Sequence, residues 1–100
     1  MKYKLIRSLD DLRGGDVAVF AHPSDMKPRL CMIVHALITG HGRRPRAQLE
    51  VSGCNHLYET HEDSDVFIVA YRFFDDSGAR RRPTAAEFIY VFDTEVRREV

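Results

Sequence analysis

The chain has 100 residues and a mass of 11.5 kDa, which is the length of one domain, so we expect a single compact domain over residues 1–100. Hydrophobic residues make up 44% of the sequence, an ordinary globular fraction that argues against intrinsic disorder. The 15 Lys and Arg residues balance 15 Asp and Glu residues, which excludes a strongly basic nucleic-acid coat and an acidic tail but allows local charged patches.

The first half of the chain predicts short strands separated by turns. Residues 2–7 alternate weakly in polarity and are expected to form an edge strand. Ser8 can cap a helical turn near residues 8–13, which a pair of glycines then ends. A short strand is expected at 17–21. Residues 30–38 are apolar on both faces and rich in β-branched side chains, which predicts a central strand.

The second half continues this alternation up to residue 74. Residues 48–52 alternate in polarity, and the Gly-Cys-Asn sequence at 53–55 is typical of a turn. Residues 56–60 then either pair back as a hairpin strand or form a short helix. Residues 66–74 are almost continuously apolar and predict the strongest strand of the chain, again in a central position.

The C-terminal segment carries two conflicting signals. Thr84 and Glu87 have the spacing of a helix capping box, and the apolar residues that follow also recur at helical spacing. However, residues 88–92 are all β-branched or aromatic, which favours a strand. We predict a strand at 86–92, followed by a final helical turn near 94–100.

Together these segments predict a mainly β fold of about six short strands. In a chain of this size they indicate a small antiparallel barrel or sandwich, similar in size to an SH3 domain. If both long strands are fully buried, replacing Ile68 or Val34 with alanine should cost about 1–4 kcal/mol of stability.

Residues 12–19 read as leucine, two further residues, glycine, aspartate and an apolar strand. This pattern resembles the turn that begins many small β-barrels. Gly15 can adopt a positive φ, and Asp16 can accept hydrogen bonds from nearby backbone amides. Because the pattern recurs across unrelated functions, it predicts fold and not activity.

A second resemblance combines Gly15-Asp16-Val17 with the later segment Lys27-Pro28-Arg29 and the apolar strand that follows it. This order resembles the small-barrel endoribonuclease toxins of toxin–antitoxin pairs over about a fifth of the chain. The order around Pro28 differs from theirs, and no later motif matches. The resemblance implies a ribonuclease in which arginine stabilises a phosphorane and an acid or histidine acts as base.

Arginine is the most distinctive residue type, with 12 of the 15 basic residues. Two clusters lie in predicted loops that are interrupted by glycine and proline. Guanidinium groups bind phosphate or carboxylate bidentately and stack on flat rings. We predict that these arginines contact a partner, the alternative being that they are simply solvated. The predicted binding residues are Arg43, Arg44, Arg46, Arg80, Arg81 and Arg82.

Metal and cysteine chemistry are weakly indicated. Four possible zinc ligands are close in sequence: His41, Cys54, His56 and His61. Their spacing matches no standard zinc site, so we expect no metal and no cofactor. Cys54 and Cys31 are expected to be reduced and not joined in a disulfide.

Two aromatic or histidine features have alternative interpretations. His35 lies in the middle of a predicted strand, where a core or sheet-face role is favoured over a ligand role. A set of aromatic side chains either forms a base-stacking stripe on one sheet face or belongs to the core. This set is Tyr58, Tyr71, Phe73, Tyr90 and Phe92.

No catalytic signature is present, so we predict a non-catalytic protein. The favoured function is a small adaptor or inhibitor that docks on a protein or ribonucleoprotein partner through its arginine-rich loops. Direct nucleic-acid binding is the first alternative, and a barrel-type endoribonuclease toxin is the second. The predicted loop at 59–65 is acidic, so it could pair with the arginine clusters of a second copy, and self-association is a further prediction. No segment has the roughly 18–20 apolar residues of a membrane span or the core of a signal peptide, which predicts a cytoplasmic protein.

Overall fold

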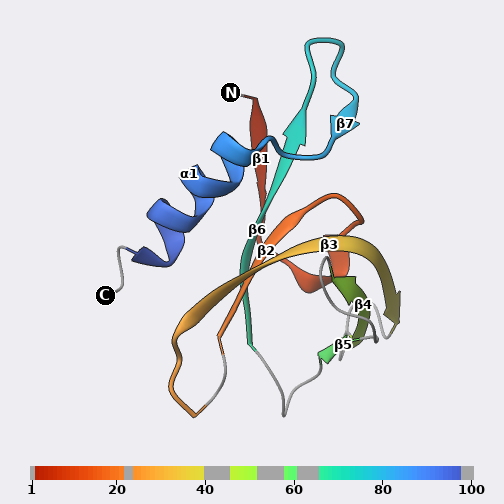
Figure 1. Cartoon of the computed structure of the whole chain (residues 1–100). Helices are drawn as coiled ribbons and strands as arrows, with labels where there is room; N and C mark the ends of the chain where they lie inside the picture. The colour runs from red at the N-terminus through yellow and green to blue at the C-terminus, as the bar shows by residue number, and fades with distance from the viewer. Residues whose placement is uncertain (1, 22–23, 40–45, 52–57, 61–65, 98–100) are drawn as a thin grey trace.

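The computed structural model describes residues 2–21, 24–39, 46–51, 58–60 and 66–97 (Figure 1). These residues form a mainly antiparallel β-sheet with one short α-helix and one 3-10 turn. The strands are β1 (Tyr3–Ile6), β2 (Val17–Ala21), β3 (Pro28–Thr39), β4 (Arg46–Val51), β5 (Tyr58–Thr60), β6 (Val66–Phe74) and β7 (Arg80–Arg81). The helix α1 spans Ala85–Glu95, and the 3-10 turn η1 spans Leu9–Asp11.

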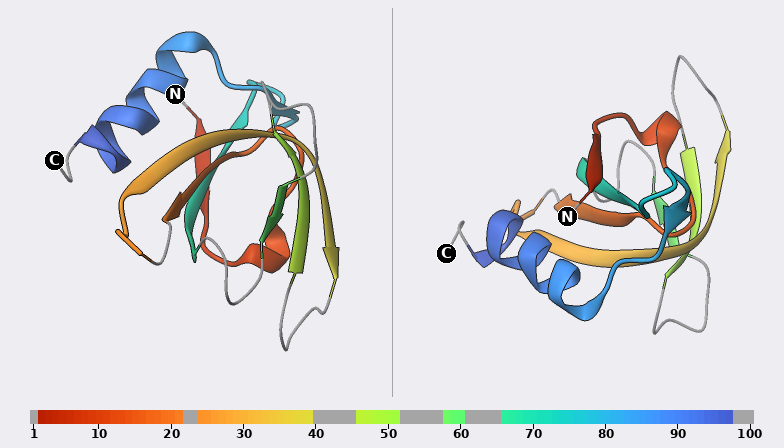
Figure 2. Two further views of the ribbon diagram at one scale, coloured as in Figure 1. Left: turned by 60° about the horizontal axis from the view of Figure 1, so that its bottom comes forward. Right: turned by 90° about the horizontal axis from the view of Figure 1, so that it is seen from above.

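The strand order is β1-β6-β2-β3-β4-β5, and the short β7 pairs with β6. The two long strands predicted to be central, β3 and β6, are indeed internal to this order, so that prediction is confirmed. Within the described residues no pairing joins β1 to β5, so the sheet is open and the predicted barrel is not confirmed. Figure 2 shows that the open sheet is nevertheless strongly curved.

Strand β3 produces much of this curvature because it is shared between two parts of the sheet. Its first part pairs with β2, from Pro28 to Met32, and its second part pairs with β4, from Ile33 to Thr39. The register shifts between Ile33 and His35, which is a β-bulge. Bulges bend a strand and increase its twist. As a result β3 arches across the molecule from α1 toward β4 (Figure 2).

The two faces of β2 contribute to two separate hydrophobic cores. Ala18 and Phe20 belong to an inner core, which the curved sheet encloses. Val17 and Val19 belong to an outer core, which lies between the sheet and Val91 of α1. Because both faces are covered, all five residues of β2 are buried. The remaining buried inner-core residues are Ile6, Leu12, Ile33, Ala47, Leu49 and Ala70.

The strand predicted at 86–92 is wrong, because these residues lie within α1. The capping box is formed: the Thr84 hydroxyl accepts from the Glu87 amide at 3.2 Å, and the Glu87 carboxylate accepts from the Thr84 amide at 2.9 Å. The helical spacing then places Val91 and Phe88 against the outer core. Local capping together with this packing outweighs the strand preference of the aromatic run.

The far end of α1 is also held to the sheet. The Tyr71 hydroxyl donates a hydrogen bond to the Glu95 carboxylate, and burial together with this bond raises the pKa of Tyr71. The helix therefore continues to Glu95, and the prediction of a separate helical turn beginning near residue 94 is wrong. Residues 98–100 lie outside the described residues.

The aromatic residues belong to different parts of the fold. Tyr71 and Phe73 are buried in the outer core, which confirms the core interpretation for these two. Tyr90 and Phe92 are on α1 and not on the sheet. A shared base-stacking stripe on one sheet face is therefore wrong for these four residues, while the side chain of Tyr58 lies outside the described part of the structure.

Two smaller predictions are confirmed. The turn near 8–13 is the 3-10 turn η1, with the Ser8 hydroxyl accepting from the Asp10 amide at 3.3 Å. Residues 58–60 pair with β4 as a hairpin strand, so the helical alternative is wrong for them.

Burial is less than expected at both positions chosen for alanine substitution. Ile68 is 41% exposed, and Val34 is half-buried beside the bulge in β3. Since much of the Ile68 side chain stays in contact with water, its truncation should cost less than the predicted 1–4 kcal/mol.

We predict that two leucines on neighbouring strands respond very differently to alanine. Leu49 is 0% exposed and Leu37 is 52% exposed, although their strands pair directly. Leu49→Ala should cost about 2–5 kcal/mol because it leaves a cavity in the inner core. Leu37→Ala should cost less than about 1 kcal/mol. Urea unfolding of both variants is the measurement, and equal costs would contradict the assignment of the inner core.

Candidate anion-binding groove

The glycine pair ahead of β2 packs closely against the bulge of β3. Gly15 has φ 93°, which few other residues tolerate, and its amide donates to the Ile33 carbonyl at 2.6 Å. A Cβ atom on Gly14 would lie 2.6 Å from the Val34 carbonyl oxygen, so a side chain there would collide with backbone. The predicted turn with a positive φ at Gly15 is therefore confirmed, and it is tied directly to the centre of the sheet.

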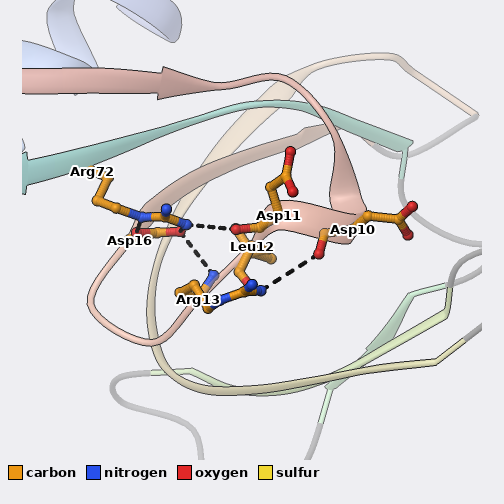
Figure 3. Close-up of polar contacts among 6 residues, drawn as sticks. All are labelled: Asp10, Asp11, Leu12, Arg13, Asp16 and Arg72. Atoms are coloured by element: carbon orange, nitrogen blue, oxygen red, sulfur yellow. Dashed lines mark hydrogen bonds and ion pairs between the residues drawn. The ribbon is translucent and has the colours of Figure 1, made fainter. Parts of the chain in front are cut away.

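Asp16 follows this turn and is the most deeply buried charged residue in the described structure. Its carboxylate accepts the Arg13 amide at 2.9 Å, as the sequence predicted. It also accepts two hydrogen bonds of 2.9 Å from the Nε and Nη2 atoms of Arg72 on β6 (Figure 3). Arg72 Nη2 donates in addition to the Asp11 carbonyl. Such a two-point pair is the strongest geometry available to guanidinium and carboxylate.

The exposed fractions show that this pair is shielded from water. The Asp16 side chain is 1% exposed and the Arg72 side chain is 14% exposed. Hydrogen bonding to Asp16 raises the pKa of Arg72, so its guanidinium stays charged. The pair joins the glycine turn to β6 and fixes the orientation of Arg72.

A second two-point pair joins β7 to the start of α1. Arg81 donates to the two carboxylate oxygens of Glu87 at 2.6 and 2.7 Å and to the Phe74 carbonyl at 3.2 Å. The Arg81 guanidinium also lies 5.8 Å from the centre of the Phe73 ring. Its hydrogen bonds lower the pKa of Glu87 to about 2. The same carboxylate completes the capping box, so one ion pair holds both β7 and the helix start.

These two pairs border a groove of about 600 Å³. Its walls come from the glycine turn, the bulged centre of β3, β6 and the β7 segment. The lining residues are Arg13, Gly14, Gly15, Asp16, Val34, His35, Ala36, Arg72, Arg80, Arg81 and Arg82. Five arginines therefore face a single cavity in a protein with a net charge of +0.

Three of these arginines are not neutralised by the described residues. Arg80 and Arg82 form no salt bridge with any described residue. Among the described residues, the guanidinium group of Arg13 donates to carbonyl oxygens and to no carboxylate; its partners are Leu12 at 3.2 Å and Asp10 at 3.5 Å. His35 is exposed on the same groove. The groove is therefore electropositive even though the whole chain is neutral.

The predicted binding arginines have different locations. Arg80 and Arg81 are in β7 and not in a loop, and Arg46 is in β4, so the loop assignment is wrong for these three. Arg43 and Arg44 lie outside the described residues, as does the side chain of Arg46. Arg80, Arg81 and Arg82 do come together, but the ion pair of Arg81 shows that this residue also stabilises the fold.

Two arginines of the groove, Arg13 and Arg72, are not among the binding residues predicted from sequence. Arg72 interrupts an otherwise apolar strand, and a charge in that setting signals a buried partner. Arg13 adjoins the glycine turn that was itself predicted. The pairing that brings Arg13, Arg72 and Arg80 together depends on strand order, which the sequence does not reveal.

The zinc candidates His41, Cys54, His56 and His61 all lie outside the described residues. Among the residues that are described, no three His, Cys, Asp or Glu side chains gather as a metal site would require. No helix in this part of the chain has the length and apolar character needed to cross a membrane.

The sequence matches no protein-family model, and comparisons with curated proteins and with solved structures also return no match.

We predict that Asp16 and Arg72 are strongly coupled. Asp16→Asn leaves a mostly buried guanidinium without its counter-charge and should cost about 3–5 kcal/mol. A double-mutant cycle with Arg72→Leu should give a coupling energy of about 1–3 kcal/mol. Chemical denaturation of the three variants is the measurement. Costs that add to within about 0.5 kcal/mol would show that the pair does not join the turn to β6.

The lowered pKa of Glu87 predicts a defined pH dependence. Because its folded-state pKa is about 2 against an ordinary value of 4.5, its stabilisation is complete above pH 4.5 and is lost as the pH falls toward 2. Glu87→Gln should be less stable at pH 7, and its stability should fall less over that acidic range. Thermal melts of both proteins from pH 7 to 2 are the measurement. Parallel curves would contradict the assigned pair.

Proposed function

We propose that the protein is a non-catalytic binding module that docks on an anionic segment of a protein or ribonucleoprotein through the arginine groove. The supporting observation is that one cavity is lined by three guanidinium groups that form no ion pair with any described residue, those of Arg13, Arg80 and Arg82. Guanidinium groups suit phosphate and carboxylate partners because both accept paired hydrogen bonds.

The concentration of positive charge has no evident benefit for stability. Like charges that share a cavity repel one another, and exposed ion pairs contribute only about 0–1 kcal/mol. Arg72 and Arg81 are different because their carboxylate partners orient them before any ligand arrives. Binding groups that are already ordered lose little conformational entropy on association. An anion would therefore meet two fixed arginines and three that are available for pairing.

The ribonuclease alternative draws support from His35, which faces the same groove as the arginines. Cleavage of RNA by transphosphorylation needs one group to remove a proton and another to return it. Among the described lining residues, His35 is the one histidine. Asp16 is occupied by Arg72. This composition supports binding over catalysis.

We predict that reversing the charge of the groove weakens anion binding without unfolding the protein. Arg80→Glu combined with Arg82→Glu should weaken binding of inorganic polyphosphate and of a hexaglutamate peptide at least tenfold, about 1.4 kcal/mol. Arg7→Glu combined with Arg29→Glu is the matched control, because it changes the net charge equally outside the groove.

Affinity is measured by fluorescence anisotropy, together with the melting temperature of each variant. The groove variant and the control should both melt within a few degrees of the original protein. If both double variants lose binding equally, or if neither probe binds the original protein, the proposed docking site is wrong.

A further inference from the structure

We infer that the ligand of the arginine groove is the phosphodiester backbone of a single-stranded nucleic acid. This inference rests on the proposed function and specifies the chemistry of its partner. Three features of the groove support it: the composition of its lining, the origin of its arginines on separate segments of the chain, and its concave shape.

The composition of the lining favours phosphate over an acidic protein surface. Val34 and Ala36 are the apolar side chains among the residues that line the groove, and both are small. Protein docking sites usually depend on aromatic or large aliphatic anchors that fill pockets. Binding of a nucleic-acid backbone depends instead on arginine and lysine charge. The described lining of the groove, with five arginines and no large apolar side chain, has the second composition.

The arginines of the groove come from three separate segments of the chain. Arg80 and Arg82 come from one wall, and Arg13 comes from the glycine turn on another. Pro83 favours an extended backbone at Arg82, so the side chains of Arg80 and Arg82 are expected to repeat along one side at a spacing of about 7 Å. Such a row can contact successive phosphates of one strand.

Arg72 adds a fixed donor to the groove. Its Nε and Nη2 atoms are used by Asp16 and by the Asp11 carbonyl, as Figure 3 shows. Its Nη1 atom makes no hydrogen bond with the described residues, and Arg72 lines the groove. A guanidinium held on one edge and unbonded at another is preorganised to donate to a phosphate oxygen.

The shape of the groove favours a single strand over a duplex. Its volume of about 600 Å³ lies in a concavity bounded by four segments of the chain. A flexible strand can bring its phosphates into such a concavity, whereas a duplex presents a stiff, convex surface. Among the described lining residues there is no Phe, Tyr or Trp ring on which bases would stack. The groove therefore recognises backbone, and RNA and DNA strands of the same length should bind alike.

The number of arginines sets the expected salt dependence. Three uncompensated guanidinium groups should neutralise about three phosphates, which gives a slope of log affinity against log salt of about −2 for a single strand. Raising the salt from 50 to 200 mM should then weaken binding by about 20-fold. Neutralising two of the three groups should reduce the slope to about −0.7.

The test uses fluorescein-labelled U12 RNA, dT12 DNA, a 12-base-pair DNA duplex and hexaglutamate, each titrated with the full chain. Arg80→Gln combined with Arg82→Gln is the groove variant, and Arg7→Gln combined with Arg29→Gln is the control of equal charge change. We expect U12 and dT12 to bind within a factor of two of each other, and at least fivefold more tightly than the duplex or the peptide. Only the groove variant should lose affinity and salt slope.

The outcomes separate this inference from the proposed function. If hexaglutamate binds in the groove and U12 does not, the single-strand assignment is overturned while docking on an anionic partner stands. If the duplex binds more tightly than U12, or if U12 binding is unchanged in the groove variant, the single-strand assignment is also overturned. If no probe depends on Arg80 and Arg82, both proposals fail. Recovery of shortened U12 after incubation would overturn the non-catalytic assignment. The melting temperature of each variant shows whether a loss of binding is caused by unfolding.

Discussion

The paired hydrogen bonds between Asp16 and Arg72 hold together the part of the molecule on which the groove depends. Asp16 receives the amide of Arg13 and the guanidinium of Arg72, so one carboxylate joins the glycine turn to β6. The same turn bonds to Ile33 at the bulge of β3. A buried charge is tolerated only when its hydrogen bonds are satisfied, and here both partners are oriented by backbone as well as by each other.

The pair of Arg81 and Glu87 repeats this arrangement at the other side of the groove. Glu87 caps α1 and neutralises Arg81, which in turn bonds to the carbonyl of Phe74 on β6. The helix start and the groove wall are therefore parts of one hydrogen-bonded unit. Two of the groove arginines, Arg72 and Arg81, therefore stabilise the fold. The other three add positive charge to the same cavity and are available to a ligand.

Much of the sheet could be predicted from sequence because its strands carry strong local signals. β6 is apolar over its whole length apart from Arg72, and β2 was bounded correctly because both of its faces are buried. The helix was missed because Phe88 to Phe92 has the composition of a strand, while its helical form depends on an ion pair with Arg81 that only the folded chain reveals.

The groove itself was only partly predictable. Arg80 to Arg82 form a conspicuous run, but their neighbours Arg13 and Arg72 come from distant segments. Three-dimensional pairing of β6 with β7, and of the glycine turn with β3, brings them together. Periodicity and turn chemistry report local structure, and they contain no information on which strands become neighbours across long stretches of sequence.

The central claim is that Arg72 and Arg81 are fixed by buried carboxylates while Arg13, Arg80 and Arg82 are available to an anion. Nitrogen-15 NMR of the arginine Nε–H groups, recorded with and without U12 RNA, tests this most directly. The account predicts slow hydrogen exchange at Arg72 and Arg81 in the protein alone, and the largest shifts on RNA addition at Arg13, Arg80 and Arg82. Fast exchange at Arg72 and Arg81, or shifts confined to arginines outside the groove such as Arg7 and Arg29, would contradict it.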